Sequence, residues 1–89
     1  MLSFSRNTEY GLIALAHLAG RAGDVASARE IAETYSLSTS LVMKILKRLQ
    51  HKGIVRSVRG VKGGYQLAVD LHAVSLYDLI ETLKQMDAS

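Results

Sequence analysis

The sequence predicts a mainly α-helical domain with one small β-hairpin, an α+β class arranged as a winged helix-turn-helix. Three observations lead to this prediction. Apolar residues recur at helical spacing in four segments of the 89-residue chain, and two of these segments are joined by only about three residues. A glycine-rich turn then joins two short runs of strand-forming residues. We expect one domain over residues 1–84 and a polar tail over residues 85–89.

The first two helices are predicted from apolar spacing and capping signals. Residues 7–19 are apolar on more than one side, which indicates a buried helix, and we expect His17 to be a packed, hydrogen-bonded residue rather than a metal ligand. A second helix begins after Ser27, because Ser27 and Glu30 fit a capping box in which each side chain bonds the other's backbone N–H. The predicted apolar face of this helix contains Ala28, Ile31, Ala32 and Tyr35.

A third helix over residues 38–52 follows a short turn, and the pair makes a helix-turn-helix. Ser38 is its expected N-cap, and Leu37 is expected to fill the gap between the two helices. The side predicted to face the core contains Val42, Ile45, Leu46 and Leu49. The opposite side begins small and polar and becomes cationic, through Ser40, Lys44, Lys47 and His51. A helix that enters a DNA major groove needs this combination.

A β-hairpin is predicted after the third helix. Residues 54–59 are β-branched, residues 65–69 alternate apolar and polar, and the turn over residues 60–64 holds three glycines. Arg59 and Lys62 lie beside this side-chain-free backbone, where long cations can enter a narrow minor groove. The turn is not followed by the helix and Lys-Ser/Thr pair of a nucleotide-binding loop, so a nucleotide site is not expected.

The last helix is predicted from a second capping signal. Ser75 would be its N-cap, with Asp78 at the third helical position. The apolar side of this helix is predicted to contain Leu76, Leu79, Ile80 and Leu83.

The positive charges are segregated along the chain. Residues 34–69 contain no Asp or Glu, whereas the net charge of the whole chain is only +3. A block of cations is typical of a surface that binds a polyanion, although a solvated run of charge gives the same pattern. We call this block the cationic segment, and its seven cations are Lys44, Lys47, Arg48, Lys52, Arg56, Arg59 and Lys62.

Composition narrows the classes of function. No apolar run approaches the ~20 residues of a membrane span, and no secretory signal is visible, so we expect a cytoplasmic protein without a membrane partner. The sequence has no cysteine, and His17, His51 and His72 share no ligand spacing. No nucleophile is paired with a base. We therefore predict no cofactor, no metal site and no enzyme activity.

Several stretches resemble the Rrf-two family of bacterial transcription regulators, which includes the IscR and NsrR types. They are YGLIALAHLA at residues 10–19, IA at 31–32, LSTSLVMKILKRL at 37–49 and GIVRSVRGVKGGYQL at 53–67. The wing phrase S-V-R-G-x-x-G-G-Y-x-L is the most specific, and the resemblance covers residues 1–84. It implies a homodimeric repressor or activator that binds a palindromic operator in double-stranded DNA.

The resemblance also implies site residues. By position in the motif, the major-groove contacts would be Ser38, Thr39, Ser40, Met43 and Lys44. Arg59 in the wing would contact the minor groove. The charge pattern, rather than the family, adds Lys47, Arg48 and Lys62 as contacts to the DNA backbone.

Two departures from the family pattern change what is expected. Ser36 stands where the family has a glycine in the turn. Family sensors usually continue into a long dimerisation helix and a three-cysteine loop that holds an iron–sulfur cluster, whereas this sequence stops at Ser89 without a cysteine. It is either the DNA-binding portion of a longer protein or a short form, and no cluster is expected in it. The first and last helices must then supply the dimer contact.

An alternative from another class remains open, a winged-helix module whose basic face binds an acidic protein. Docking of a protein partner favours exposed large apolar groups, and the predicted outer face of the third helix offers only Leu41 and Met43. RNA is a weaker alternative, because the four Tyr and one Phe are scattered and form no stacking platform.

Overall fold

The computed structural model describes residues 4–21 and 23–88. The described residues form four α-helices: α1 (Arg6–Gly20), α2 (Ala28–Tyr35), α3 (Thr39–His51) and α4 (Leu76–Lys84). They also form the strands β1 (Val55–Val58) and β2 (Gly64–Leu67) and the 3-10 helices η1 (Leu71–Ala73) and η2 (Gln85–Ala88). The predicted mainly α winged helix-turn-helix is confirmed. None of the helices within this part of the chain has the length and apolar content needed to cross a membrane.

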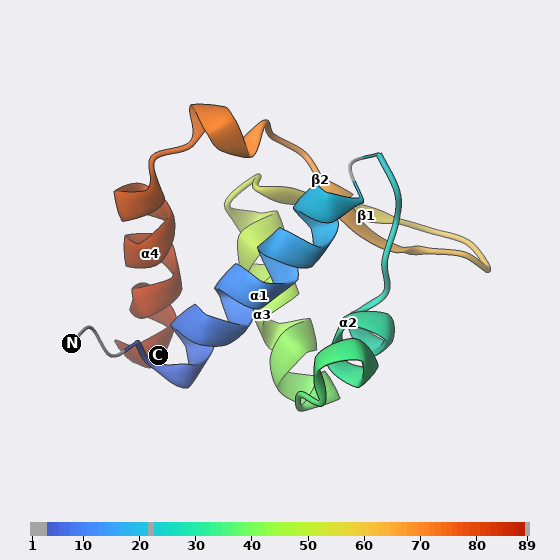
Figure 1. The fold of residues 1–89 in the computed structure, drawn as a ribbon, viewed down its shortest axis with the longest axis horizontal. Helices are drawn as coiled ribbons and strands as arrows, with labels where there is room; N and C mark the ends of the chain where they lie inside the picture. Colours follow the sequence, from blue (N-terminus) through green and yellow to red (C-terminus); the bar gives the residue numbers. More distant parts are fainter. Residues whose placement is uncertain (1–3, 22, 89) are drawn as a thin grey trace.

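The core lies where α1, α2, α3 and α4 meet. Figure 1 shows α1 crossing in front of α3, with α4 on one side of the molecule and the hairpin protruding from the other. Each helix contributes one buried stripe, and all four residues of α3 that were predicted to face the core are almost completely buried. The largest buried side chains are Leu15, Leu18, Ile31, Ile45, Leu46, Leu49 and Leu83.

Serine side chains cap the helices as the sequence predicts. The Ser27 hydroxyl accepts from the backbone N–H of Glu30 at 3.0 Å, and Ser38 and Ser75 make equivalent bonds at the starts of α3 and α4. The other half of the predicted box at Ser27 is wrong. A Glu30 carboxylate oxygen is directed to His17 and Arg21 instead, because an imidazole and a guanidinium lie within reach across α1.

The turn between α2 and α3 depends on one left-handed residue. Ser36 has φ 56° and ψ 47°, and no other non-glycine residue within the described ranges has a positive φ. An L-residue in this region is strained, whereas glycine is not, so the glycine that the family resemblance implies at this position would fit the turn without strain. The N–H groups of Ser36 and Leu37 both donate to the Ala32 carbonyl. Leu37 packs against the core, as predicted.

The wing is an antiparallel pair in which Val55 lies opposite Leu67 and Val58 opposite Gly64. An unpredicted bridge extends this small sheet, since Ala26 and Tyr65 exchange backbone hydrogen bonds of 2.9 and 2.8 Å. The bridge explains the third glycine of the wing, because a Cβ on Gly64 would overlap the Ala26 carbonyl.

The C-terminal part differs from the sequence-based expectation in two ways. Leu76 was assigned to the apolar side of α4 but is 63% exposed, because the first turn of α4 lies away from α1 (Figure 1). Residues 85–88 were expected to be part of a polar tail, yet they continue α4 as η2. Met86 is only 5% exposed and belongs to the core, and Asn7 of α1 donates to the Asp87 carboxylate at 2.7 Å.

Candidate nucleic-acid interface

The exposed face of α3 begins with small polar side chains. Ser38, Thr39 and Ser40 are all exposed, and the Ser38 hydroxyl is also the helix cap. Because the opposite side of α3 is packed into the core, these residues must face solvent. Lys44 and Lys47 continue the exposed face one and two turns later. The structure therefore brings the predicted major-groove residues of α3 onto one surface.

Met43 lies at the edge of this surface. Its side chain is 43% exposed, whereas Leu41 is half-buried and packs against the core. A single apolar group on an otherwise polar face is small for a protein docking surface. It is sufficient to contact one thymine methyl group in a major groove.

The wing carries the remaining predicted cations. Arg59 and Lys62 are exposed in the loop between β1 and β2. This loop is closed by the Gly63 N–H, which donates to the Gly60 carbonyl at 2.9 Å. Gly60 has φ 121°, and a Cβ on Gly63 would overlap the Val58 carbonyl, so both glycines are needed for the loop conformation. The loop between β1 and β2 thus carries two cations beside glycines, which have no side chain.

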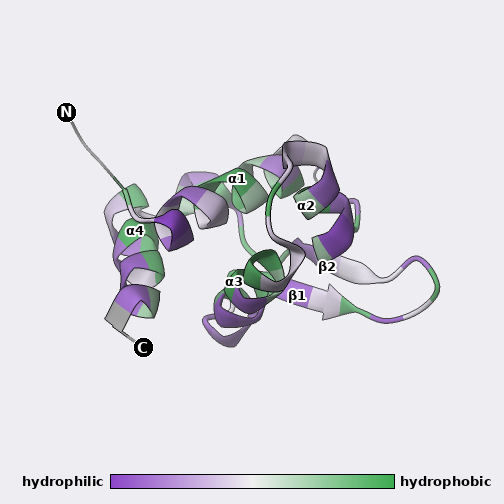
Figure 2. Ribbon diagram, turned by 90° about the horizontal axis from the view of Figure 1, so that it is seen from below, coloured by the Kyte–Doolittle hydropathy of each residue, from purple (hydrophilic) through white to green (hydrophobic). Residues whose placement is uncertain are grey.

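The helix α3 and the wing share one side of the molecule. Figure 2 shows α3 and the hairpin together on the side that faces away from α1, and the outer turns of α3 are mostly hydrophilic. A duplex laid against this side would meet both elements. The arrangement is the one that a winged helix-turn-helix needs to contact two neighbouring grooves.

Among the described residues, the cations of this side make no ion pair. The ion pairs among residues 4–21 and 23–88 use basic groups outside the cationic segment, namely His17, Arg21, Arg29 and Lys84. The seven cations of the segment therefore face solvent or neutral groups. Like charges gathered on one surface produce a positive potential that attracts a polyanion.

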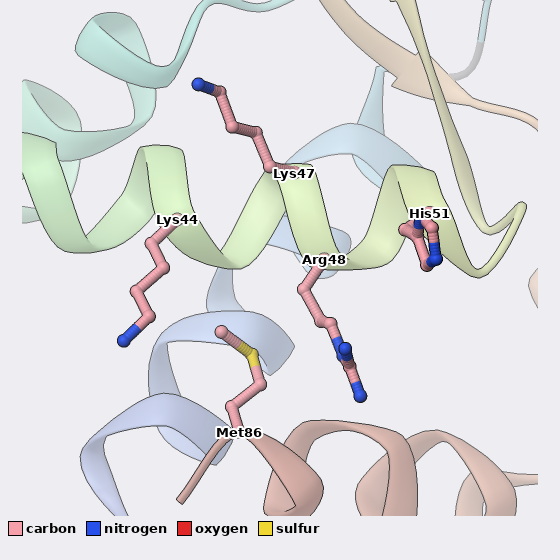
Figure 3. A pocket seen from close by; sticks show the side chains of 5 residues that line it. All are labelled: Lys44, Lys47, Arg48, His51 and Met86. Carbon is pink, nitrogen blue, oxygen red and sulfur yellow. The ribbon is translucent and has the colours of Figure 1, made fainter. Parts of the chain in front are cut away.

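Arg48 differs from the other cations. It is only partly exposed, its Nη2 donates to the Gln85 side-chain oxygen at 3.5 Å, and its Nε is buried without a hydrogen-bond partner among the described groups. Figure 3 shows Lys44 and Arg48 extending from α3 toward Met86, whereas Lys47 leaves the opposite edge of the helix. Gln85 and Met86 were not predicted as neighbours of α3, because no local pattern in the sequence links them to that helix.

A shallow pocket lies between α3 and η2, and we call it the α3–η2 depression. Its lining consists of Lys44, Lys47, Arg48, His51 and Met86 (Figure 3). None of the described residues in this lining is acidic.

His17 of α1 contacts two side chains of α2. Its Nδ1 lies 2.9 Å from the Tyr35 hydroxyl, and its Nε2 lies 3.0 Å from a Glu30 carboxylate oxygen. The prediction of a packed, hydrogen-bonded histidine is confirmed. Tyr35 was expected on the buried face of α2, but it is 40% exposed and uses its hydroxyl to reach His17. The imidazole thus ties α2 to α1.

The known proteins that this chain resembles are transcriptional regulators. A family model described as "Rrf2: Iron-dependent Transcriptional regulator" matches residues 4–89. The HTH-type transcriptional regulator NsrR of Bacillus subtilis is 34% identical over 80 residues, which are 89% of this chain and 55% of the relative. The chain spans about half the length of the curated relatives it matches, 54% and 55% for two of them.

Solved structures with the same architecture are also regulators. CymR (YrzC), the global cysteine regulator of B. subtilis, superposes with a TM-score of 0.86 at 34% identity, covering 94% of this chain and 66% of CymR. IscR of T. potens superposes with a TM-score of 0.83 at 35% identity, covering 92% of this chain and 61% of IscR. These relatives do not support the alternative of a module for an acidic protein partner.

The residues of this chain do not fit the iron named in that family description. The sequence has no cysteine, and no three His, Asp or Glu side chains gather into a metal site within the described ranges. Both ring nitrogens of His17 are within hydrogen-bond distance of Tyr35 and Glu30.

Proposed function

The chain belongs to the Rrf2 family of transcriptional regulators, and on this premise we propose that it is a sequence-specific DNA-binding regulator of transcription. One observation carries the proposal. The cations of α3 and the wing, which make no ion pair with the described residues, lie on elements that share one side of the molecule (Figure 2). A duplex in contact with that side would meet the helix in its major groove and the wing in the adjacent minor groove.

The N-terminal turn of α3 would read bases. Short side chains at Ser38, Thr39 and Ser40 let the helix end approach base edges closely, and their hydroxyls donate or accept hydrogen bonds. Met43 would contact a thymine methyl group, and Lys44 would reach a guanine edge or a phosphate.

The wing and the outer edge of α3 would contact the sugar-phosphate backbone and the minor groove of the DNA. Arg59 would enter the minor groove, where a narrow groove concentrates negative potential. Lys47, Arg48 and Lys62 would contact phosphates, which position the protein without reading sequence. This division separates residues for specificity from residues for general affinity.

We further propose a homodimer on a palindromic operator, which acts in the cytoplasm as a repressor or an activator. Helix-turn-helix dimers place equivalent recognition helices about one DNA turn, ~34 Å, apart. The exposed Leu76 and Tyr77 of α4, which are 63% and 70% exposed, supply apolar surface for the contact between the subunits. The helix α1 packs beside α4 and would join this contact.

Selection of bound duplexes from a random pool tests the proposal directly. An enriched site with two-fold symmetry is expected. With about three to five phosphates neutralised per subunit, log K for a dimer should fall with log salt at a slope of roughly −5 to −9. A scrambled duplex is the control for specificity. No enrichment together with salt-independent binding would contradict a DNA-binding role.

A further inference from the structure

The α3–η2 depression has the composition of an anion site. Its polar side chains come from α3 at spacings of three and four residues, and Lys44 and Arg48 extend from the edge of the helix that faces Met86 (Figure 3). The floor comes from Met86 of η2 (Figure 3). A depression with several cations, an apolar floor and no acidic group attracts an oxyanion rather than a cation.

Arg48 is the central donor of this depression, and most of its hydrogen-bonding capacity is not used by the described residues. A guanidinium has five N–H donors in a rigid fork. Its one hydrogen bond to Gln85, at 3.5 Å, is long for a bond of this type, and its Nε has no partner among the described groups. Buried donors without partners are rare in folded proteins, since they cost free energy. An oxyanion in the depression would accept from the terminal N–H groups of this guanidinium.

The position of Arg48 is set by the C-terminal turn. The Gln85 side-chain oxygen lies beside the guanidinium, 3.5 Å from Nη2, and the buried Met86 lines the same depression. The turn is itself held by the hydrogen bond from Asn7 to Asp87. Arg48 is therefore more restricted than Lys44 and Lys47, whose side chains extend into solvent. A donor held in place loses less conformational entropy when it binds.

We propose that the α3–η2 depression is a phosphate seat, in which Arg48 binds one DNA-backbone phosphate and Gln85 is the positioning residue for Arg48. The proposal rests on the proposed DNA-binding function and adds the C-terminal turn to the interface. A phosphate takes two parallel hydrogen bonds from a guanidinium, which an ammonium group does not provide. Phosphate contacts carry no sequence information, so the seat contributes affinity to every duplex alike.

The test compares Gln85→Glu with Lys84→Gln. Both variants lower the net charge by one at neighbouring positions, but only Gln85→Glu places a carboxylate against Arg48. The Gln85→Glu variant should reduce the salt slope by about 0.9 per subunit, ~1.8 for a dimer. At ~0.15 M salt this slope corresponds to an about 30-fold loss of affinity, equal for operator and random duplex. The Lys84→Gln variant should retain the wild-type slope.

Two variants of Arg48 distinguish the contribution of the guanidinium geometry from that of the positive charge. Arg48→Met should reproduce the slope of Gln85→Glu, and Arg48→Lys should retain the slope while losing part of the affinity. Circular dichroism on each variant reports folding independently of DNA. An equal loss in Gln85→Glu and Lys84→Gln, or an unchanged slope in Arg48→Met, would overturn the seat. Failure of the wild type to bind any duplex would instead overturn the proposed function, and the seat with it.

Free inorganic phosphate identifies the source of the oxyanion. If phosphate displaces duplex better than chloride at equal ionic strength, and Arg48→Met removes this advantage, the seat also takes free phosphate. If the two salts act equally while the slopes change as expected, the backbone phosphate alone occupies the seat. A phosphate advantage that persists in Arg48→Met would place the anion elsewhere and overturn the assignment.

Discussion

Replacement of Ser36 by glycine should stabilise the domain, because this turn holds an L-residue in the left-handed region. That conformation costs an L-residue about 1–2 kcal/mol, which glycine does not pay. Glycine in turn loses about 0.5–1 kcal/mol more entropy on folding. The net expectation is a gain of roughly 0.5–1 kcal/mol, or about 2–8 °C in Tm for a domain of this size. Urea and thermal denaturation, followed by circular dichroism, measure both quantities.

Two control variants test whether left-handed strain at Ser36 is the cause of the expected gain in stability. Ser36→Ala keeps the left-handed strain and should give no gain. Ser57→Gly removes the same atoms from an exposed position in β1 and should cost about 0.5–1 kcal/mol, because glycine weakens a strand. If Ser36→Gly is neutral or destabilising, or if Ser36→Ala stabilises equally, strain at this turn is not the cause. Operator affinity per folded molecule should not change, since Ser36 precedes α3.

Three further predictions address the interface and the core. Arg59→Ala should weaken operator binding by roughly 1–3 kcal/mol and random-duplex binding less, which competition titration with both duplexes measures. Lys47→Ala should weaken both duplexes alike and lower the salt slope by about 1 per subunit, and an unchanged random-duplex affinity would contradict its phosphate role. Gly11→Ala should lower the free energy of unfolding by about 1–3 kcal/mol in denaturation experiments, because the new Cβ would overlap the buried Leu83. Gly20→Ala is the control: its Cβ would meet no neighbouring atom, so this variant should not be destabilised.

The features that the sequence predicted well are local. The caps at Ser27, Ser38 and Ser75 each bond a backbone N–H three residues away, so the pattern and the contact lie in the same short window. The buried stripe of α3 follows from helical spacing alone. The hairpin follows from a glycine turn between two strand-forming runs. Such signals need no knowledge of where the rest of the chain lies.

The features that escaped prediction join distant residues. Tyr65 pairs with Ala26, and Arg48 meets Gln85, at separations of 39 and 37 residues that no periodicity reports. Glu30 satisfied the pattern of a capping box, but His17 and Arg21 compete for its carboxylate across the packed helices. A local rule gives the options open to a side chain, and tertiary neighbours select among them.

In the proposed complex the positive charges would attract DNA, but burial determines which residues of α3 are exposed to it. Rotating α3 by one residue, about 100°, would carry its outer lysines toward the core and bring buried aliphatic residues out. Burying an unpaired lysine costs several kcal/mol, and exposing a leucine costs about 1.5–3 kcal/mol more. The orientation of α3 is therefore fixed far more strongly than any single contact with a base. Substitutions in the core of α3 should accordingly relax sequence discrimination before they abolish electrostatic binding, because phosphate contacts tolerate a displaced helix and base contacts do not.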